Sequence, residues 1–125
     1  MKMQADRMEG RNAIARHGPG GVIVAGVAHS NSVIVPWDGG VRAWPPRDFE
    51  ALAAAHFEML AQLEPELVIF GSGARLRFPN PALLRVLMQQ RIGIETMDTP
   101  AACRTYNVLL AEGRRVIAAL LFEPS

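Results

Sequence analysis

The sequence predicts a small α/β domain in which β-hairpins come first and a βαβα unit follows. Half of the 125 residues are apolar, which is enough for one hydrophobic core without a disulfide or a metal. Residues 20–46 contain clusters of valine separated by glycine, asparagine and proline, a composition typical of β-hairpins. Residues 67–122 alternate short apolar runs with segments of helical periodicity, as chains that form parallel sheets do.

The hairpin region contains three predicted strands. Valine and isoleucine at 22–24 and 33–35 indicate the first two, and residues 41–44 form the third. An Asp-Gly-Gly turn precedes the third strand. The Pro-Pro pair that follows it ends the pairing, because proline has no backbone N–H to donate.

A helix is predicted from Asp48, a suitable N-cap, to the residue before Pro65. Its apolar face consists of Phe49, Leu52, His56, Met59, Leu60 and Leu63. We expect His56 to pack within this face as a structural residue. If the helix begins later, near Ala54, His56 lies in its first turn and is exposed.

The second half predicts a strand, a crossover helix and a second strand. Residues 67–70 are all apolar, which indicates a strand buried on both faces. Asn80 and Pro81 suit the N-cap and first position of a helix that continues to Arg91. Its apolar face consists of Leu83, Leu84, Leu87 and Met88. Residues 92–97 form the next strand, so we expect the two strands to be parallel neighbours.

Another helix and a last strand complete the predicted fold. Thr99 and Pro100 repeat the capping pattern, with Asp98 as the residue that starts the helix. Gly113 suits the left-handed conformation that ends it. Residues 115–122 are nearly all apolar, which predicts a central strand.

Three stretches of the second half, residues 65–79, 91–107 and 109–121, resemble the Mth-type domain family. The most specific positions are Gly71-x-Gly73, Glu95-x-Met97, Thr105-Tyr106-Asn107 and Glu112-Gly113-Arg114. The similarity extends over residues 12–122. Family members more often carry threonine where this chain has Ser72, and both residues supply a hydroxyl.

The resemblance implies a three-layer α/β domain with a mixed central sheet, flanking helices and an accessory β-hairpin. The family includes the adipogenesis-associated Mth domain-containing protein and a mitochondrial assembly factor for respiratory complex I, which implies an assembly or scaffold role. It provides no catalytic residues that can be transferred to this chain. The catalytic residues are therefore unknown from sequence.

Loops at the carboxyl ends of parallel strands commonly bind ligands, and two predicted strands end close together. The edge that they form contains Gly71, Ser72, Gly73, Arg75, Asp98 and Thr99. Amides of the Gly-Ser-Gly turn, a helix N-terminus and an arginine are together able to bind an anion. An anionic small molecule is thus one candidate ligand.

The same glycines have a simpler explanation, which is a tight turn or a close approach of two backbones. The Gly-Ser-Gly turn lacks the third glycine of a dinucleotide-binding motif and the lysine of a P-loop. Nucleotide binding is therefore disfavoured, and we expect no cofactor. Asp98 is more simply explained as a helix cap than as a general base.

Five further residues are candidates for structural or interaction roles. Trp37 and Trp44 place large apolar groups either on an exposed hairpin that binds a partner or in packing over the sheet. Tyr106 is expected to cover the sheet edge, and Asn107 to bond to a loop backbone. Arg114 is expected to pair with a charge near the last strand.

Charge and cysteine content exclude several classes of function. Thirteen basic and twelve acidic residues leave a net charge of +1, which gives no footprint for nucleic acid or an anionic membrane. Cys103 is the single cysteine, so no intramolecular disulfide forms, and we expect a core residue rather than a reactive thiolate. The three histidines lie in separate regions, so no bound metal is expected.

Length and hydropathy predict one domain over residues 1–125, with residues 1–12 as a flexible segment. No apolar run reaches the ~18 residues that span a bilayer, and the first residues lack the apolar core of a secretory signal. We therefore expect a cytoplasmic protein without membrane insertion.

These observations favour a non-enzymatic, protein-binding or assembly-factor-like module whose partner is another protein. The alternative is a small binding protein or enzyme that takes an anionic metabolite at the edge around Ser72, Arg75 and Asp98. An exposed hairpin edge would also permit a homodimer.

Overall fold

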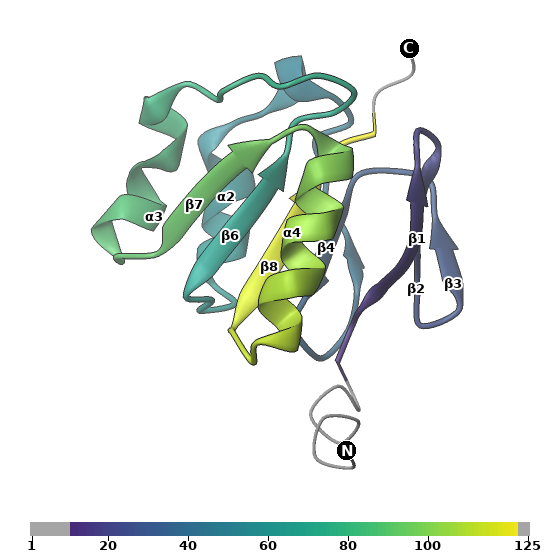
Figure 1. The fold of residues 1–125 in the computed structure, drawn as a ribbon. Helices are drawn as coiled ribbons and strands as arrows, with labels where there is room; N and C mark the ends of the chain where they lie inside the picture. The colour runs from purple at the N-terminus through teal and green to yellow at the C-terminus, as the bar shows by residue number, and fades with distance from the viewer. Residues whose placement is uncertain (1–10, 123–125) are drawn as a thin grey trace.

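The computed structural model describes residues 11–122, which form two β-sheets and the helices that pack on them (Figure 1). The predicted flexible segment 1–12 lies almost wholly outside the described residues. Its last residue, Asn12, is buried and donates its side-chain amide to Pro36 O at 2.9 Å and Gly39 O at 2.8 Å.

The main sheet has five strands in the order β5-β4-β8-β6-β7. They are β4 (Val33–Pro36), β5 (Arg42–Ala43), β6 (Leu67–Gly71), β7 (Gly93–Met97) and β8 (Val116–Leu120). β6 runs parallel to both β7 and β8, whereas β4 is antiparallel to β8 and β5. The predictions of parallel strands 67–70 and 92–97 and of a central last strand are confirmed.

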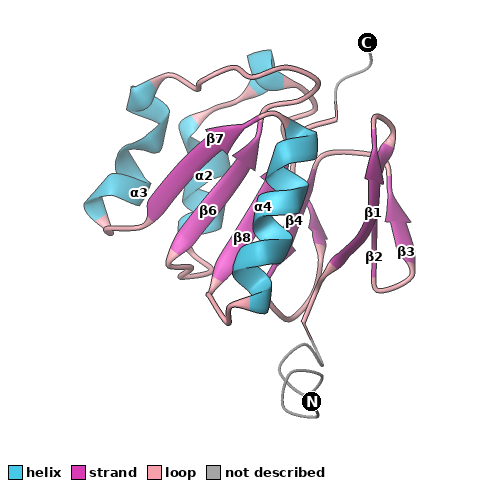
Figure 2. Ribbon diagram, in the orientation of Figure 1, coloured by secondary structure: helices cyan, strands magenta, loops and turns pink. Residues whose placement is uncertain are grey.

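The accessory sheet has three antiparallel strands, β1 (Ile14–Gly18), β2 (Gly21–Val24) and β3 (Val27–His29). The sequence prediction included β2 only. β1 and β3 lack a clear alternation because most of their side chains face solvent. The sheet stands beside the main body, next to α4 (Thr99–Ala111) (Figure 2).

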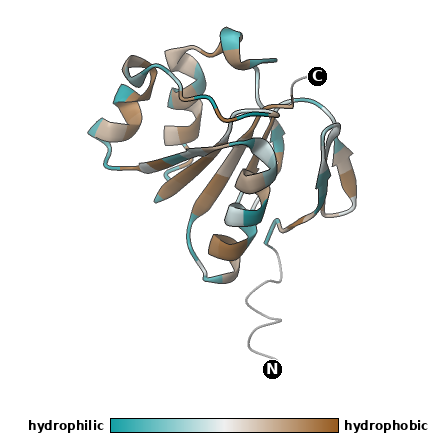
Figure 3. Cartoon of the chain, turned by 45° about the horizontal axis from the view of Figure 1, so that its top comes forward, coloured by the Kyte–Doolittle hydropathy of each residue, from teal (hydrophilic) through white to brown (hydrophobic). Residues whose placement is uncertain are grey.

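Helices cover both faces of the main sheet, which confirms the three-layer α/β architecture. α4 packs on one face, and α2 (Ala54–Ala61) and α3 (Arg85–Gln89) pack on the other. Ile69 and Leu120 face α4, while Val68 and Phe70 face α2 and α3. Figure 3 shows hydrophobic strands between the helical layers.

The predicted helix 48–64 is interrupted. A 3₁₀ turn, η1 (Phe49–Ala51), is capped by the Asp48 carboxylate, which accepts the Ala51 N–H at 2.9 Å. The backbone then extends through Leu52 and Ala53, and α2 begins at Ala54. His56 therefore lies in the first turn, where its Nδ1 accepts the Ala53 N–H at 2.9 Å. The later helix start is the one observed, but His56 is half-buried and its ring packs edge-on against Trp44, so the expected exposure is wrong.

The predicted helix 80–91 also divides, into η2 (Pro81–Leu84) and α3. Asn80 caps it as predicted, since its Oδ1 accepts the Ala82 N–H at 2.9 Å. Leu87 is fully buried, but Met88 is 66% exposed. The prediction that Met88 belongs to the buried face is wrong, because the short α3 presents only about one turn to the sheet.

Gly71 lies where β6 leaves the sheet, and a side chain there has no room. A Cβ on Gly71 would lie 2.9 Å from Leu120 Cδ2, 2.9 Å from Thr99 Oγ1 and 3.1 Å from Thr99 Cα. The glycine is therefore needed for a close approach of β6 to α4, which is the simpler of the two explanations given by the sequence.

We predict that Gly71→Ala lowers the free energy of unfolding by roughly 1–3 kcal/mol, because the methyl group overpacks this junction. Gly40→Ala is the matched control, since a Cβ there meets nothing within 4 Å. Urea unfolding of both variants measures the difference. Equal stability of the two variants would show that the junction can relax.

Candidate functional site

β6 and β7 end side by side, and their exits form the predicted edge. Gly71 and Met97 are register partners at the last position of the parallel ladder. Beyond the ladder, Ser72 N donates to Met97 O at 2.9 Å, and Thr99 N donates to Gly73 O at 2.9 Å. The structure thus brings together the segments 71–73 and 97–99, on which the candidate ligand edge depended.

The hydroxyl of Ser72 points into the protein. Ser72 is fully buried, and its Oγ donates to Arg75 O at 2.8 Å, with Met97 O at 3.2 Å. The same oxygen accepts the Arg77 N–H at 3.0 Å. The hydroxyl therefore closes the turn after β6.

Thr99 and Asp98 are bonded in a similar way. The Thr99 hydroxyl accepts the Gly73 N–H at 2.8 Å and donates to Leu121 O at 2.7 Å. The Asp98 carboxylate accepts the Ala101 N–H at 2.9 Å, so it caps α4. Both side chains stabilise the start of the helix.

These bonds leave the Gly-Ser-Gly turn with little to offer an anion. The amides of Ser72 and Gly73 both have protein acceptors. Arg75 is exposed. Anion binding at this edge stays a prediction, which now requires ligand contacts other than these two amides.

The loop that follows the edge exposes apolar side chains that the sequence analysis did not single out. Leu76 is 51% exposed and Phe78 is 70% exposed. Arg77, between them, stacks over the Phe49 ring at 4.3 Å and bonds to Glu50 Oε2 at 2.9 Å. The alternation of arginine with leucine and phenylalanine at 75–78 was the sequence signal from which this exposed apolar loop could have been found.

A cavity of about 690 Å³ opens beside this edge, toward the accessory sheet. Its lining consists of His17, Gly18, Pro19, Gly20, Gly73, Ala74, Thr99, Pro100, Leu121 and Phe122. It thus lies between the β1–β2 turn, the exits of β6 and β8, and the first turn of α4. The sequence could not predict it, because the turn 18–20 and the strand ends meet only through the tertiary fold.

The two tryptophans pack against the protein. Trp44 is 3% exposed, its Nε1 donates to His56 O at 3.1 Å, and its ring meets Phe57 and Phe70 edge-on. Trp37 is half-buried. Of the two alternatives for Trp44, packing over the sheet is the one observed, because its ring belongs to the core between the sheet and α2.

Tyr106 and Asn107 connect α4 to the chain before and within β1. The Tyr106 hydroxyl lies 2.9 Å from Asn12 O and 3.0 Å from Pro36 O. Asn107 exchanges two 2.9 Å hydrogen bonds with the backbone N–H and C=O of Ile14. Burial raises the pKa of the Tyr106 hydroxyl well above its usual value.

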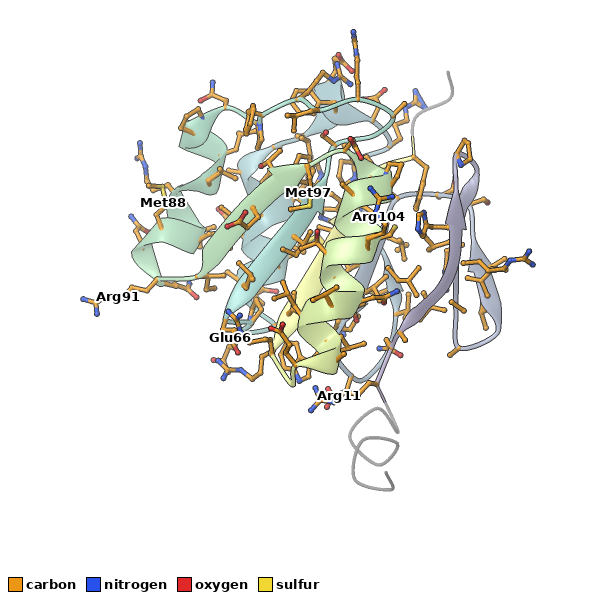
Figure 4. The ribbon with its side chains drawn as sticks, in the orientation of Figure 1. Arg11, Glu66, Met88, Arg91, Met97 and Arg104 are labelled. Carbon is orange, nitrogen blue, oxygen red and sulfur yellow. The ribbon has the colours of Figure 1, made fainter. Side chains whose placement is uncertain are left out.

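Arg114 and Glu66 form an ion pair at the opposite end of the sheet, where Figure 4 labels Glu66. Arg114 Nε donates to Glu66 Oε2 at 2.8 Å, and Arg115 N donates to Oε1 at 3.0 Å. The backbone and side-chain hydrogen bonds from these arginines lower the pKa of Glu66. Arg114 is thus remote from the ligand edge.

Within residues 11–122, no group of three His, Cys, Asp or Glu side chains is arranged to hold a metal ion. None of the helices described there is long and apolar enough to cross a bilayer.

A family model described as "Protein of unknown function (DUF498/DUF598)" matches residues 14–121. The chain belongs to this family. The family assignment agrees with the resemblance carried by the Gly71-x-Gly73 and Thr105-Tyr106-Asn107 positions.

Three similar proteins illustrate the family. A Bordetella parapertussis crystal structure is 37% identical, covers 90% of this chain and 97% of its own, and has a TM-score of 0.85. A Bordetella pertussis solution structure described as a Mth938-like domain is 31% identical, with coverage of 89% and 85% and a TM-score of 0.79. The Bos taurus NADH dehydrogenase [ubiquinone] 1 alpha subcomplex assembly factor 3 is 37% identical over 83 residues, 65% of this chain. The match spans 45% of that relative's length.

We predict that Ser72→Ala lowers the free energy of unfolding by about 1–3 kcal/mol, because it leaves the Arg75 carbonyl and the Arg77 N–H without their partner. Ser30→Ala is the control, since Ser30 is exposed. Chemical denaturation measures both. If Ser72→Ala had the same free energy of unfolding as the wild type, water would replace the hydroxyl without loss of stability.

A second prediction concerns Cys103. Burial raises the pKa of its thiol from 9.0 to about 11. The thiol's contribution to stability is therefore fully present below pH 9 and is lost as the pH rises to about 11, by up to about 3 kcal/mol. Urea unfolding across this range should show a steeper loss for the wild type than for Cys103→Ala. The prediction would be wrong if the wild type and Cys103→Ala lost stability equally over this pH range.

Proposed function

We propose that this chain is a non-enzymatic protein-binding module of the assembly-factor kind, and that β7 is the strand to which a partner binds. The proposal rests on one feature, the free edge of the main sheet. β7 is the last strand in the sheet order, so one side of its backbone has no strand neighbour within residues 11–122. An extended segment of a partner can add there as a sixth strand.

The free hydrogen-bonding groups belong to alternate residues of β7. Gly93 N donates to Glu66 O at 3.1 Å, and Met97 O accepts the Ser72 N–H, so these residues turn their backbone toward β6. In a parallel ladder, successive residues of a strand direct their backbone N–H and C=O groups to opposite sides. Ile94 and Thr96 therefore direct their N–H and C=O groups outward.

The surroundings of this edge suit a protein partner. Met88 and Arg91 extend away from the body on the α3 side of β7, and Met97 lies at the carboxyl end of the strand (Figure 4). Met88 is 66% exposed and Met97 half-buried, while Glu95 is exposed. Methionine adapts to irregular apolar surfaces, and Glu95 favours a basic residue opposite it on the added strand.

The names of the relatives support a binding role. The Bos taurus relative is named an assembly factor for NADH dehydrogenase, and this chain matches part of that protein. Transfer of the role to this chain is part of the proposal. A partner from respiratory or membrane-protein assembly is the expected class.

Thr96→Pro tests the edge directly. Proline removes only the outward N–H of Thr96, and proline is tolerated at such positions of edge strands, so the β6–β7 ladder should remain. We expect the variant to fold, by circular dichroism, and to lose proteins that co-purify with the wild-type chain from its native extract. Thr96→Val, which keeps the N–H and the β-branched shape, should retain them.

Two results would contradict the proposal. Co-purification that is equal for the wild type and Thr96→Pro would place the partner elsewhere on the surface. Reproducible absence of any partner for the wild-type chain would argue against a binding module altogether.

A further inference from the structure

The cavity beside the strand ends differs from β7 in both position and chemistry. Its volume of about 690 Å³ falls in the range of small-molecule sites. One wall is the turn 18–20 between β1 and β2, and the other is formed by residues 73–74, 99–100 and 121–122. The walls come from the two sheets and α4.

The lining is apolar, with little side-chain polarity to offer. Glycines, prolines, Ala74, Leu121 and Phe122 supply most of it. Only His17 and Thr99 carry polar side-chain atoms, and the Thr99 hydroxyl already bonds to Gly73 N and Leu121 O. A ligand therefore finds one side-chain hydrogen-bonding group, the imidazole of His17.

The position of His17 follows from the register of the accessory sheet. His17 is directly opposite Val22 in the antiparallel pair, and Val22 is 2% exposed. Residues opposite each other present their side chains on the same face. The imidazole is thus on the same face as Val22 and lines the cavity, at its open side because His17 itself is exposed.

The first turn of α4 adds no anion site to this cavity, although Thr99 and Pro100 line it. Thr99 N donates to Gly73 O, Ala101 N to the Asp98 carboxylate and Ala102 N to Asp98 O. Pro100 has no N–H. The Asp98 carboxylate at the helix start also disfavours a second negative charge nearby.

We propose that this cavity binds a single soluble, uncharged amphiphile, with its apolar body against the glycine and proline walls and its one polar head on His17. A molecule with more polar groups would leave them unpaired in an apolar site, which costs binding free energy. A carboxylate or phosphate head would meet no free amide in the first turn of α4. The ligand proposed here therefore differs in charge from the anion considered at Ser72 and Arg75, although Gly73 and Thr99 border both places.

The test uses 1-octanol and octanoate, which have equal chain length and differ in head-group charge. In ¹⁵N-labelled full-length chain, 1-octanol should shift the amide resonances of residues 17, 18, 20, 73 and 74 and reach saturation. Octanoate should bind at least about tenfold more weakly. His17→Leu should weaken 1-octanol binding by about three- to tenfold, the worth of one hydrogen bond.

Two filling variants provide the control against non-specific adsorption. Gly20→Leu and Ala74→Trp place side chains at the cavity walls, and either should abolish the saturable shifts while the rest of the spectrum stays folded. Gly40→Leu is the matched variant, because a Cβ at Gly20 or Gly40 meets nothing within 4 Å and Gly40 does not line the cavity. It should bind like the wild type.

Three outcomes would overturn the proposal: no saturable shift with 1-octanol, shifts that survive in both filled variants, or octanoate binding as tightly as 1-octanol. Thr96→Pro separates this site from the β7 edge, because it should leave 1-octanol binding unchanged whether or not it removes a protein partner.

Discussion

The Thr99 hydroxyl is the contact on which the arrangement of the site depends. It is buried, accepts the Gly73 N–H and donates to Leu121 O, so one oxygen joins the exits of β6 and β8 to the start of α4. Gly71 makes this possible, because any side chain there would meet Thr99. Three segments distant in sequence thus share one junction, and an unpaired buried group at that point would cost about 1–3 kcal/mol. The polar groups of the Gly-Ser-Gly turn thus form hydrogen bonds within the protein, and these bonds fix the conformation of the turn.

A second set of contacts on α4 fixes the accessory sheet. Tyr106 and Asn107 hold the chain at Asn12 and Ile14, near the start of β1. Within residues 11–122, no comparable hydrogen bond joins the turn 18–20 to the main body. The cavity opens there, between the turn and the strand exits. The apolar space is therefore a consequence of where α4 holds the sheet. Figure 1 shows the accessory sheet beside that helix.

The sequence predicts those parts of the fold whose signals are local. β6 and β8 are almost entirely apolar, Asp98 and Asn80 are good caps, and the parallel pairing of β6 with β7 follows from the crossover length. β1 and β3 were not predicted because most of their side chains are solvated, so their sequences lack an apolar alternation. The break in the helix after Ala51 was not predicted because it depends on packing, which sequence periodicity does not report. The sequence correctly predicted that residues 71–73 and 97–99 lie side by side. The chemistry of this edge was not predictable, because the partners of Ser72 and Thr99 include Met97 and Leu121, which only the tertiary structure brings near.

This internal use of polar groups bears on function. A general base or nucleophile must reach a substrate proton or carbonyl, within about 3 Å. Ser72 and Thr99 direct their hydroxyls, and Asp98 its Oδ1, to backbone groups of the same chain. What the described surface leaves available is of another kind: the outward backbone of Ile94 and Thr96, exposed Met88 and Phe78, and an apolar cavity with one imidazole. Covering a strand edge or an apolar surface lowers the free energy of the system, which is the physical basis of the two binding proposals.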